Sequence, residues 1–299
     1  MKVAISGPTG LIGTALGESL AADGVQILAL SRKPAVPPLE TIRWDVESGR
    51  FDASGLEQVD AVVHLAGEPI AQRWNEARKK VIRESRVKST ALLVEGLKSL
   101  KRKPKVLISG SAVGFYGDRG DEVLEETSPP GSGFLPETCQ AWERAAMEAM
   151  GVGIRTAVLR TGIVLSTRGG ALKKMLPPFR LGVGGPVGSG QQWMSWIHID
   201  DIVGAIRHII DKDDLMAAVN GTAPAPATNA EFTRAFGRAL SRPAFLPAPA
   251  FGLKIAFGEM ATMLLEGQRV VPRKLLDTGY RFRFPELSAA LSDVLARKR

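Results

Sequence analysis

The first 22 residues constrain the fold of this chain more than any other segment. An apolar run at residues 3–5 predicts a buried strand, and a helix-like run spans residues 11–22. Three glycines follow the strand and enter the helix: Gly7, Gly10 and Gly13. Strand, glycine turn and helix in this order predict a dinucleotide site. The spacing is GxxGxxG rather than GxGxxG, and the alternative is a glycine-rich turn that binds no ligand.

Each glycine has a physical task in such a site. Gly7 would allow the tight turn, Gly10 would let the backbone approach a pyrophosphate, and Gly13 would let the helix pack on the strand. Amide groups at the helix start, where Thr9 leads into the first turn, would face the phosphates.

The first two thirds of the chain alternate between apolar strand-like runs and amphipathic helical stretches. We predict strands near residues 3–6, 26–31, 41–44, 61–65, 106–109 and 156–160, and helices near 11–22, 75–100 and 136–150. This alternation is typical of an α/β protein with a Rossmann-type, doubly wound parallel sheet and helices on both faces. The ligand would lie at the C-terminal ends of the strands.

The pattern becomes irregular after about residue 165. A glycine-rich loop is expected at residues 182–190, and short helices are expected near 229–240 and 253–265. We therefore predict a nucleotide-binding domain over residues 1–165, with a strand and helix returning to it around 191–220. Residues 166–299 would form a smaller C-terminal lobe that shapes the substrate pocket.

Composition narrows the class of protein. The chain has 299 residues, of which 44% are hydrophobic, and no apolar run reaches the roughly 18 residues of a membrane span. Met1 leads directly into a strand, so we expect no secretory signal. The single cysteine, Cys139, excludes an internal disulfide and suits a reducing cytosol, so a cytoplasmic location is expected.

Charge and histidine usage bear on partners. The net charge of +8 permits an anionic small-molecule substrate. The basic patch at residues 98–105 has no interleaved aromatic residues, so we expect no nucleic acid partner. We expect no membrane partner either. The histidines are scattered, with no cluster of acids or cysteines beside them, so no metal site is predicted.

The second strand ends in Ser31 and Arg32, where an NAD-preferring site would carry an acidic residue. A guanidinium pairs with a 2′-phosphate, so NADP(H) is favoured. Alternatively, Arg32 is a solvated loop cation. Asp45, at the end of the third strand, could accept a hydrogen bond from the adenine amino group or cap the following turn.

Later strand ends supply further candidates. Small residues after the fourth strand, Leu65, Ala66 and Gly67 before Glu68, would let the backbone lie against the cofactor. His64, inside that apolar strand, is expected to be a core histidine. Ser109 and Ser111 leave the fifth strand where a ring carbonyl or hydroxyl could be bound. The phenol of Tyr116 could act as an acid, or its ring could simply be packed.

Together these features resemble the extended short-chain dehydrogenase/reductases, and within them the epimerase-family (nucleoside-diphosphate-sugar epimerase-like) proteins. The resemblance spans nearly the whole chain. Its motifs are the glycine turn, Leu65-Ala66-Gly67, Gly67-Glu68-Pro69-Ile70, Ser85-Arg86, Leu159-Arg160-Thr161-Gly162, Gly184 to Gly190, Trp196 to Asp201, and Leu264 to Arg269.

The resemblance implies roles for individual residues. Gly7, Gly10, Leu11, Ile12 and Gly13 would bind the pyrophosphate, and Ser31 with Arg32 would bind the adenosine phosphate. Leu65, Ala66 and Glu68 would border the adenosine and ribose. Arg86 would contact the cofactor from the long helix predicted near residues 75–100. The backbone at Gly162 and Ile163 would face the nicotinamide.

One departure from the family pattern concerns catalysis. The family uses Tyr-x-x-x-Lys on one helix face, whereas the corresponding segment here reads Cys139-Gln-Ala-Trp-Glu143. The i, i+4 spacing keeps both side chains on one face. Glu143 would raise the pKa of Cys139 by like-charge repulsion, or could act as a base if buried. Cys139 could equally be ordinary helix packing.

The sequence thus supports two functional hypotheses. The first is an NADP(H)-dependent oxidoreductase or epimerase acting on a small carbonyl or hydroxyl compound, possible substrates including sugar-nucleotide-like molecules. Its candidate catalytic residues are Ser111 as hydrogen-bond donor, Glu143 or Tyr116 as acid/base, and Cys139 at the position of the family's tyrosine. The second is an NADPH-binding protein with little catalysis and a regulatory or division-related role, as loss of the Tyr/Lys pair would allow.

Overall fold

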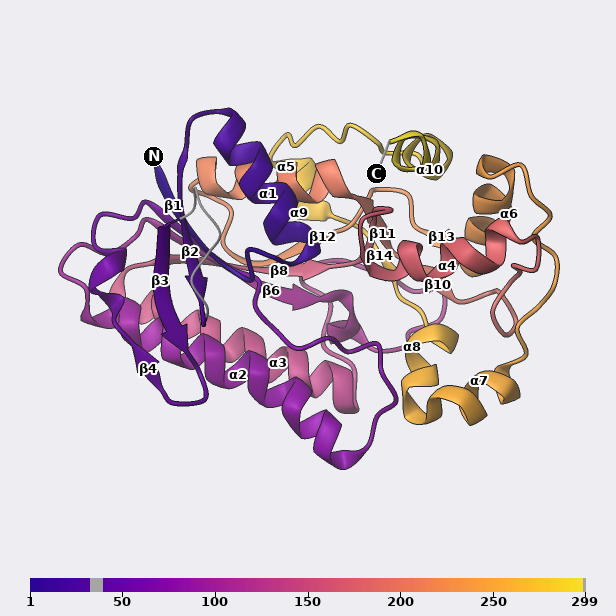
Figure 1. Cartoon of the computed structure of the whole chain (residues 1–299), viewed down its shortest axis with the longest axis horizontal. Helices are drawn as coiled ribbons and strands as arrows, with labels where there is room; N and C mark the ends of the chain where they lie inside the picture. Colours follow the sequence, from indigo (N-terminus) through magenta and orange to yellow (C-terminus); the bar gives the residue numbers. More distant parts are fainter. Residues whose placement is uncertain (33–39, 298–299) are drawn as a thin grey trace.

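The computed structural model describes residues 1–32 and 40–297, and its centre is an eight-stranded sheet (Figure 1). The strand order is β12-β8-β6-β5-β1-β2-β3-β4, and every neighbouring pair is parallel except β3 and β4. The strands are β1 (Lys2–Ser6), β2 (Gln26–Ser31), β3 (Glu40–Asp45), β4 (Arg50–Phe51), β5 (Ala61–His64), β6 (Val106–Ala112), β8 (Arg155–Thr161) and β12 (Ala217–Gly221). The predicted doubly wound parallel sheet is confirmed.

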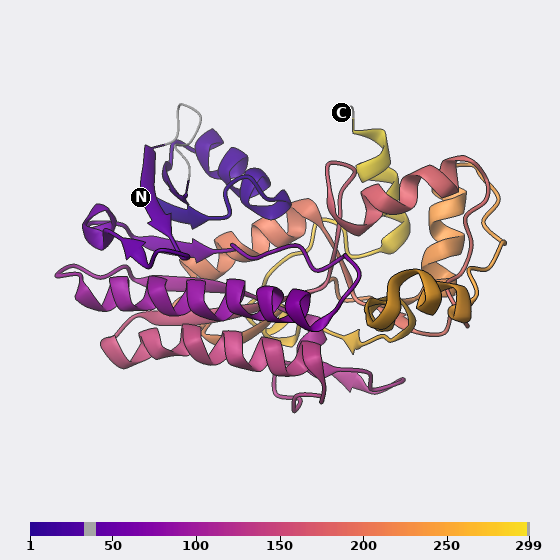
Figure 2. The ribbon, with the colours of Figure 1, turned by 60° about the horizontal axis from the view of Figure 1, so that its bottom comes forward.

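Helices cover both faces of this sheet. One face packs against α1 (Leu11–Ala22) and α5 (Ile199–Asp211), through a core that includes Ile5, Leu16 and Ile206. The other face packs against α2 (Glu76–Ser99) and α3 (Phe134–Met147), which lie side by side in Figure 2. Because the central strands are apolar on both sides, they are buried as a parallel sheet requires.

The chain returns to the sheet late in the sequence. After α5, strand β12 pairs with β8 along five residues and forms the sheet edge. The motif that begins at Trp196 builds this return: His198 caps α5 by accepting a hydrogen bond from the Asp200 amide, and the Asp201 carboxylate accepts from the amides of Arg283 and Phe284.

Most of the remaining elements lie toward one end of the long axis, whereas α9 (Arg273–Asp277) packs against β12 of the central sheet (Figure 1). The other helices are α4 (Gly170–Arg180), α6 (Asn229–Ala239), α7 (Ala250–Phe257), α8 (Thr262–Leu265) and α10 (Leu287–Ala296). The short strands are β7 (Val123–Leu124), β9 (Ile163–Leu165), β10 (Trp193–Met194), β11 (Trp196–His198), β13 (Ala227–Thr228) and β14 (Arg269–Val270). A core around Phe232, Phe236 and Leu291 holds α4, α6 and α10 together.

The helix expected at residues 253–265 differs from prediction. Helix α7 begins earlier, after Pro249, and ends at Gly258, whose φ of 59° lies in the left-handed region. Glycine adopts this conformation at no steric cost, and it cannot continue an α-helix. A 3₁₀ turn and the short α8 follow.

Candidate functional site

The glycine turn between β1 and α1 is closely packed. Gly7 has a φ of 69°, and a Cβ there would meet the backbone of Leu65 and Ala66 at 3.1 Å. A Cβ on Gly13 would lie only 2.2 Å from the Gly7 carbonyl oxygen. The turn therefore needs glycine for conformation at Gly7 and for close approach at Gly13.

The start of α1 is open toward a ligand. Gly10 is the N-cap residue and offers no side chain to the first turn. The first amide groups of a helix have no partner within the helix, and they favour an anion. Leu11 and Ile12, which supply these amides, are only part-buried, so the geometry fits the predicted pyrophosphate position.

A buried polar bridge joins this turn to the neighbouring strand end. Ser6 Oγ accepts hydrogen bonds from the amides of Leu65 and Ala66 at 3.1 and 3.2 Å. Its own proton then goes to His64 Nδ1 at 2.6 Å, so the second ring nitrogen carries the histidine proton and donates to Thr90 Oγ1 at 3.0 Å.

His64 is therefore a satisfied core histidine, as predicted. Burial lowers the pKa of His64 to about 4, so the ring is neutral at physiological pH. The neutral ring is required here, because the bridge needs Nδ1 as an acceptor.

The loop after β5 is held by Arg86. Its guanidinium donates to the carbonyls of Ile82 and Glu68 at 3.0 and 3.1 Å and lies over the Trp142 ring at 5.2 Å. A Cβ on Gly67 would be 3.3 Å from the Arg86 Cζ. Arg86 thus shapes the loop expected to border the adenosine, and burial lowers the pKa of Arg86.

At the end of β2 the two polar candidates differ in exposure. Ser31 is half-buried, whereas the Arg32 side chain is 65% exposed and lies 3.7 Å from Glu47. A surface ion pair of this kind holds a guanidinium weakly, which leaves Arg32 able to meet a phosphate. Asp45 accepts hydrogen bonds from the amides of Glu47 and Ser48, so it caps the turn.

The segment after β8 is fixed by backbone bonds. The amide of Gly162 donates to Gly221 at 3.1 Å, and that of Ile163 donates to Ser195 at 2.7 Å. A Cβ on Gly162 would lie 2.2 Å from the Ser195 carbonyl oxygen. Both amides are therefore occupied, and this segment would present a rigid wall to a nicotinamide.

The residues at the Tyr-x-x-x-Lys position belong to a buried ion-pair network. Glu143 accepts hydrogen bonds from Ser111 Oγ at 2.6 Å and from two Arg160 nitrogens at 2.8 Å each. All three residues are buried, and each is at most 8% exposed. A bidentate Arg–carboxylate pair is among the strongest charge-assisted contacts, so Arg160 compensates the buried charge of Glu143.

This network assigns the hydroxyl proton of Ser111. A serine has one proton to donate, and an ionised carboxylate can only accept. While Glu143 is ionised, the proton of Ser111 points to Glu143, and Ser111 offers only its lone pairs to a bound molecule. Ser109, deeper in β6, donates to the Gly110 carbonyl at 3.3 Å.

Cys139 lies beside Ser111, and it is 5% exposed. Burial, followed by the charge of Glu143, raises the pKa of Cys139 to about 12, so its thiolate is not populated at neutral pH. The expected like-charge effect is present, and burial is the larger cause. The geometry favours the packing interpretation of this cysteine.

Tyr116 is fully buried on the other side of Arg160. Its hydroxyl donates to Asn220 Oδ1 at 2.7 Å and accepts from Arg160 at 3.0 Å, and burial raises the pKa of Tyr116. Because the Tyr116 hydroxyl already has a hydrogen-bond acceptor and a hydrogen-bond donor, the structure favours a packed ring over a catalytic acid.

Sequence reasoning did not assign a role to Arg160 or Asn220. The signal for Arg160 was present, since it is the one cation within the strand predicted at residues 156–160. A cation in such a position needs a buried partner. Asn220 had no comparable signal, because its partners Tyr116 and Val271 are distant in sequence.

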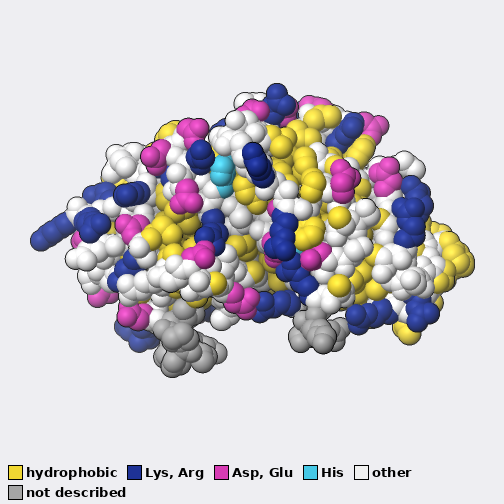
Figure 3. Space-filling view, turned by 90° about the horizontal axis from the view of Figure 1, so that it is seen from above, with side chains coloured by type: hydrophobic (Ala, Val, Ile, Leu, Met, Phe, Trp, Pro, Cys, Tyr) yellow, Lys and Arg dark blue, Asp and Glu magenta, His cyan; other side chains and the backbone are white. Residues whose placement is uncertain are grey.

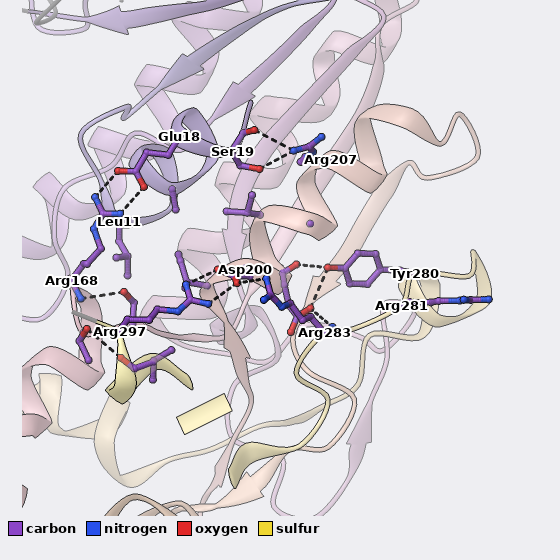
Figure 4. Close-up of a pocket in the computed structure, with 18 residues that line it drawn as sticks. Leu11, Glu18, Ser19, Arg168, Asp200, Arg207, Tyr280, Arg281, Arg283 and Arg297 are labelled. Atoms are coloured by element: carbon purple, nitrogen blue, oxygen red, sulfur yellow. Dashed lines mark hydrogen bonds and ion pairs between the residues drawn. The ribbon is translucent and has the colours of Figure 1, made fainter. Parts of the chain in front are cut away.

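A hollow of about 710 Å³ lies between α1, α5, α10 and the segment at residues 166–168 that follows β9 (Figure 4). Its cations are largely engaged by carboxylates: Arg168 forms a two-point contact with Glu18 at 2.6 and 2.7 Å, and Arg297 does so with Asp200. These pairs tie the helices together. Within residues 1–32 and 40–297 no group of histidine, cysteine and acidic side chains could hold a metal.

The fold and the glycine turn define a doubly wound, dinucleotide-binding α/β protein. The chain belongs to the NAD dependent epimerase/dehydratase family, whose model matches residues 3–220, and a domain of unknown function (DUF1731) matches residues 248–294. None of the helices in the described parts of the chain is both long and apolar enough to cross a membrane.

Similar proteins share nearly the full length. The epimerase family protein SDR39U1 of Bos taurus is 43% identical over 302 residues, covering 99% of this chain and 100% of that protein. The crystal structure of human epimerase family protein SDR39U1 (isoform 2) with NADPH has a TM-score of 0.90 and 42% identity, covering 98% of this chain and 99% of that chain. The nucleoside-diphosphate sugar epimerase from Corynebacterium glutamicum has a TM-score of 0.80 and 36% identity, covering 99% of this chain and 58% of that chain.

Proposed function

We propose that this chain is an NADP(H)-binding oxidoreductase or epimerase of the extended short-chain dehydrogenase/reductase type. The observation that carries the proposal is the uncapped start of α1 behind a glycine turn that tolerates no side chain at Gly7 or Gly13. The NADPH in the human relative's structure supports the same cofactor here. When bound, the cofactor supplies hydride transfer.

These contacts support the following placement of the cofactor. The amides of Leu11 and Ile12, reached past Thr9 and Gly10, hold the pyrophosphate. Arg32, with Ser31 beside it, holds the 2′-phosphate. The loop that Ser6 and Arg86 hold in place, Leu65 to Glu68, borders the adenosine and ribose, and Gly162 and Ile163 back the nicotinamide.

The reacting groups lie at the C-terminal end of β6. Ser111 accepts a proton from a substrate hydroxyl while its own proton passes to Glu143 over the 2.6 Å contact, and reduction reverses this path. Arg160 keeps the carboxylate oriented. The substrate is a small carbonyl or hydroxyl compound of the sugar-nucleotide class, as the name of the Corynebacterium relative suggests.

The cofactor proposal is tested by calorimetric titration with NADPH and, separately, NADH. We expect tighter binding of NADPH, and a roughly 10- to 100-fold loss of that binding in Arg32→Asp, because a charge-assisted contact to the phosphate is removed. Arg50→Asp, at an exposed arginine of β4, is the matched control and should leave binding unchanged. Binding of neither nucleotide would contradict the proposal.

The catalytic proposal is tested with Ser111→Ala. Turnover of NADPH with an accepted carbonyl substrate should fall roughly 100-fold or more, with NADPH affinity retained, because one relay atom is removed. Turnover should fall by a similar factor in Glu143→Gln, because the glutamine side chain has the same shape but cannot take the proton. Full activity in both variants would refute these roles.

One observation favours a second candidate, an NADPH-binding protein with little catalysis and a regulatory or division-related role. The charge of Glu143 is compensated by its ion pair with Arg160. The pKa of Cys139 is raised to about 12, so this residue does not act as a thiolate at neutral pH. Tight NADPH binding without turnover across a panel of aldehydes, ketones and nucleotide sugars would support this candidate over the enzyme.

A further inference from the structure

One end of the long axis carries a surface that is rich in cations and poor in carboxylates. Helix α6, the connection at residues 240–249 and helix α7 lie at this end (Figure 1). Residues 232–258 contain four cations and no Asp or Glu: Arg234, Arg238, Arg242 and Lys254. All four side chains are exposed.

A second carboxylate-free segment lies against the first. Residues 149–199 contain no Asp or Glu, and their part from α4 onward includes the exposed cations Lys173, Lys174 and Arg180. Backbone hydrogen bonds join the two segments, from Leu246 to Gly184 at 3.3 Å and from Ala248 to Pro186 at 2.8 Å. These bonds hold residues 184–186, which follow α4, against the connection at residues 240–249.

Large apolar side chains project from this surface. Leu181 is 78% exposed, Phe245 and Phe251 are each 70% exposed, and Ile255 is 71% exposed. Helix α7 has no buried residue at all. Hydrophobic side chains flanked by Lys and Arg are visible at the same end of the molecule in Figure 3. Several protruding apolar side chains in one area indicate an interaction surface.

The apolar and cationic groups are interleaved. Arg234, Arg238 and Arg242 follow one another at four-residue spacing, and with Phe245 they line a shallow hollow of about 560 Å³. The acids that border residues 232–258 each have a partner: the Glu231 carboxylate accepts hydrogen bonds from Thr228 and lies near Arg234 of the same helix, and Glu259 pairs with Lys79.

We propose that this surface, the basic-apolar end, docks on a bilayer containing anionic phospholipid. Clustered cations attract anionic headgroups, and protruding aromatic and aliphatic tips insert at the headgroup boundary. A second copy fits poorly, because a two-fold contact would place two cation-rich surfaces face to face. An acidic protein would complement the charge, but not the separate protruding apolar tips.

This inference departs from the sequence-based expectation of no membrane partner. That expectation rested on the lack of a spanning segment, and docking at an interface needs none. The inference does not depend on the proposed enzymatic function.

The experiment is vesicle co-sedimentation of the full chain. One set of vesicles contains phosphatidylcholine alone, and the other contains about 30% phosphatidylglycerol, a fraction chosen to bring the surface to a strongly negative potential. We expect binding to the second set only, weakening as salt screens the charges. The triple variant Arg234→Gln/Arg238→Gln/Arg242→Gln should bind roughly 100-fold more weakly.

The matched control removes the same charge elsewhere. Lys101→Gln/Arg102→Gln/Lys105→Gln changes three exposed cations of the patch before β6 and should bind as the unmodified chain does. Phe245→Ser/Phe251→Ser should weaken binding even at low salt. Circular dichroism and the thermal midpoint establish that each variant is folded.

Hydrogen exchange gives an independent readout. Amides at residues 241–257 should gain protection on anionic vesicles. The proposal is overturned by a lack of binding at low salt, by equal losses in the two glutamine triples, or by self-association that Phe245→Ser/Phe251→Ser abolishes without vesicles.

Discussion

At the scale of single residues, the candidate site depends on where each proton lies. The Ser6 hydroxyl accepts hydrogen bonds from two backbone amides and has one proton, which it donates to His64. His64 in turn donates to Thr90. This order is possible only with a neutral imidazole. A protonated ring would lose the acceptor that holds Ser6, and with it the backbone beside Gly7.

This arrangement predicts acid sensitivity. Between pH 6.5 and about pH 4 the unfolded chain binds a proton at His64 that the folded chain does not, so stability rises with pH over this range. The contribution is about 3 kcal/mol, lost as pH falls from 6.5 to about 4. Urea unfolding at pH 7 and pH 4 checks this contribution. The difference in the free energy of unfolding between the unmodified chain and His64→Asn should be smaller at pH 4 than at pH 7 by about this amount. A pH-independent difference would contradict the bridge.

At the scale of elements, the contact between α1 and the turn before it decides whether a cofactor can approach. Gly13 allows the first turn of α1 to lie directly on the Gly7 carbonyl. Gly17, one turn later on the same helix, has only an ordinary contact with Ile27 at 4.0 Å. The two glycines therefore differ in function although they lie on one helix.

Gly13→Ala should shift α1 outward. We expect a stability loss of about 1–3 kcal/mol from overpacking and at least a 10-fold loss of NADPH affinity, measured by urea unfolding and calorimetry. Gly17→Ala is the matched control, and its higher helix propensity should stabilise the chain by up to about 1 kcal/mol. Equal effects of the two substitutions would show that the close packing at Gly13 is unimportant.

At the scale of the whole molecule, the extent of burial differs between helices. Helix α10 buries Ala290, Leu291 and Val294 completely or nearly so, whereas helix α7 buries no residue. Opening free energy follows buried apolar contact and hydrogen bonding. Helix α7 is therefore expected to be much less protected than helix α10.

Hydrogen exchange of the free protein should show this difference. Amides of residues 250–257 should open with free energies near the low end of a range from about 0 to the global value of about 5–15 kcal/mol. Amides of residues 287–296 should approach the upper part of that range. Equal protection of the two helices would contradict this account.

Local patterns in the sequence determined the sheet, the glycine turn and the core status of His64. Each depends on nearest neighbours: strand hydrophobicity, a positive φ or close approach at glycine, and one histidine inside an apolar strand. The helix at residues 253–265 was wrong because propensity does not reveal which glycine adopts the left-handed conformation. Gly258 does so, and it ends α7.

Only the tertiary structure decided what the residues at positions 139 and 143 contact. Glu143 pairs with Arg160 because α3 packs along β6 and β8. Tyr116 meets Asn220, 104 residues later in the sequence, because β12 returns to pair with β8. Periodicity in a sequence states which face of an element is buried, but the partner on that face depends on strand order. The two carboxylate-free segments are likewise distant in sequence, and only the tertiary structure brings parts of them into contact.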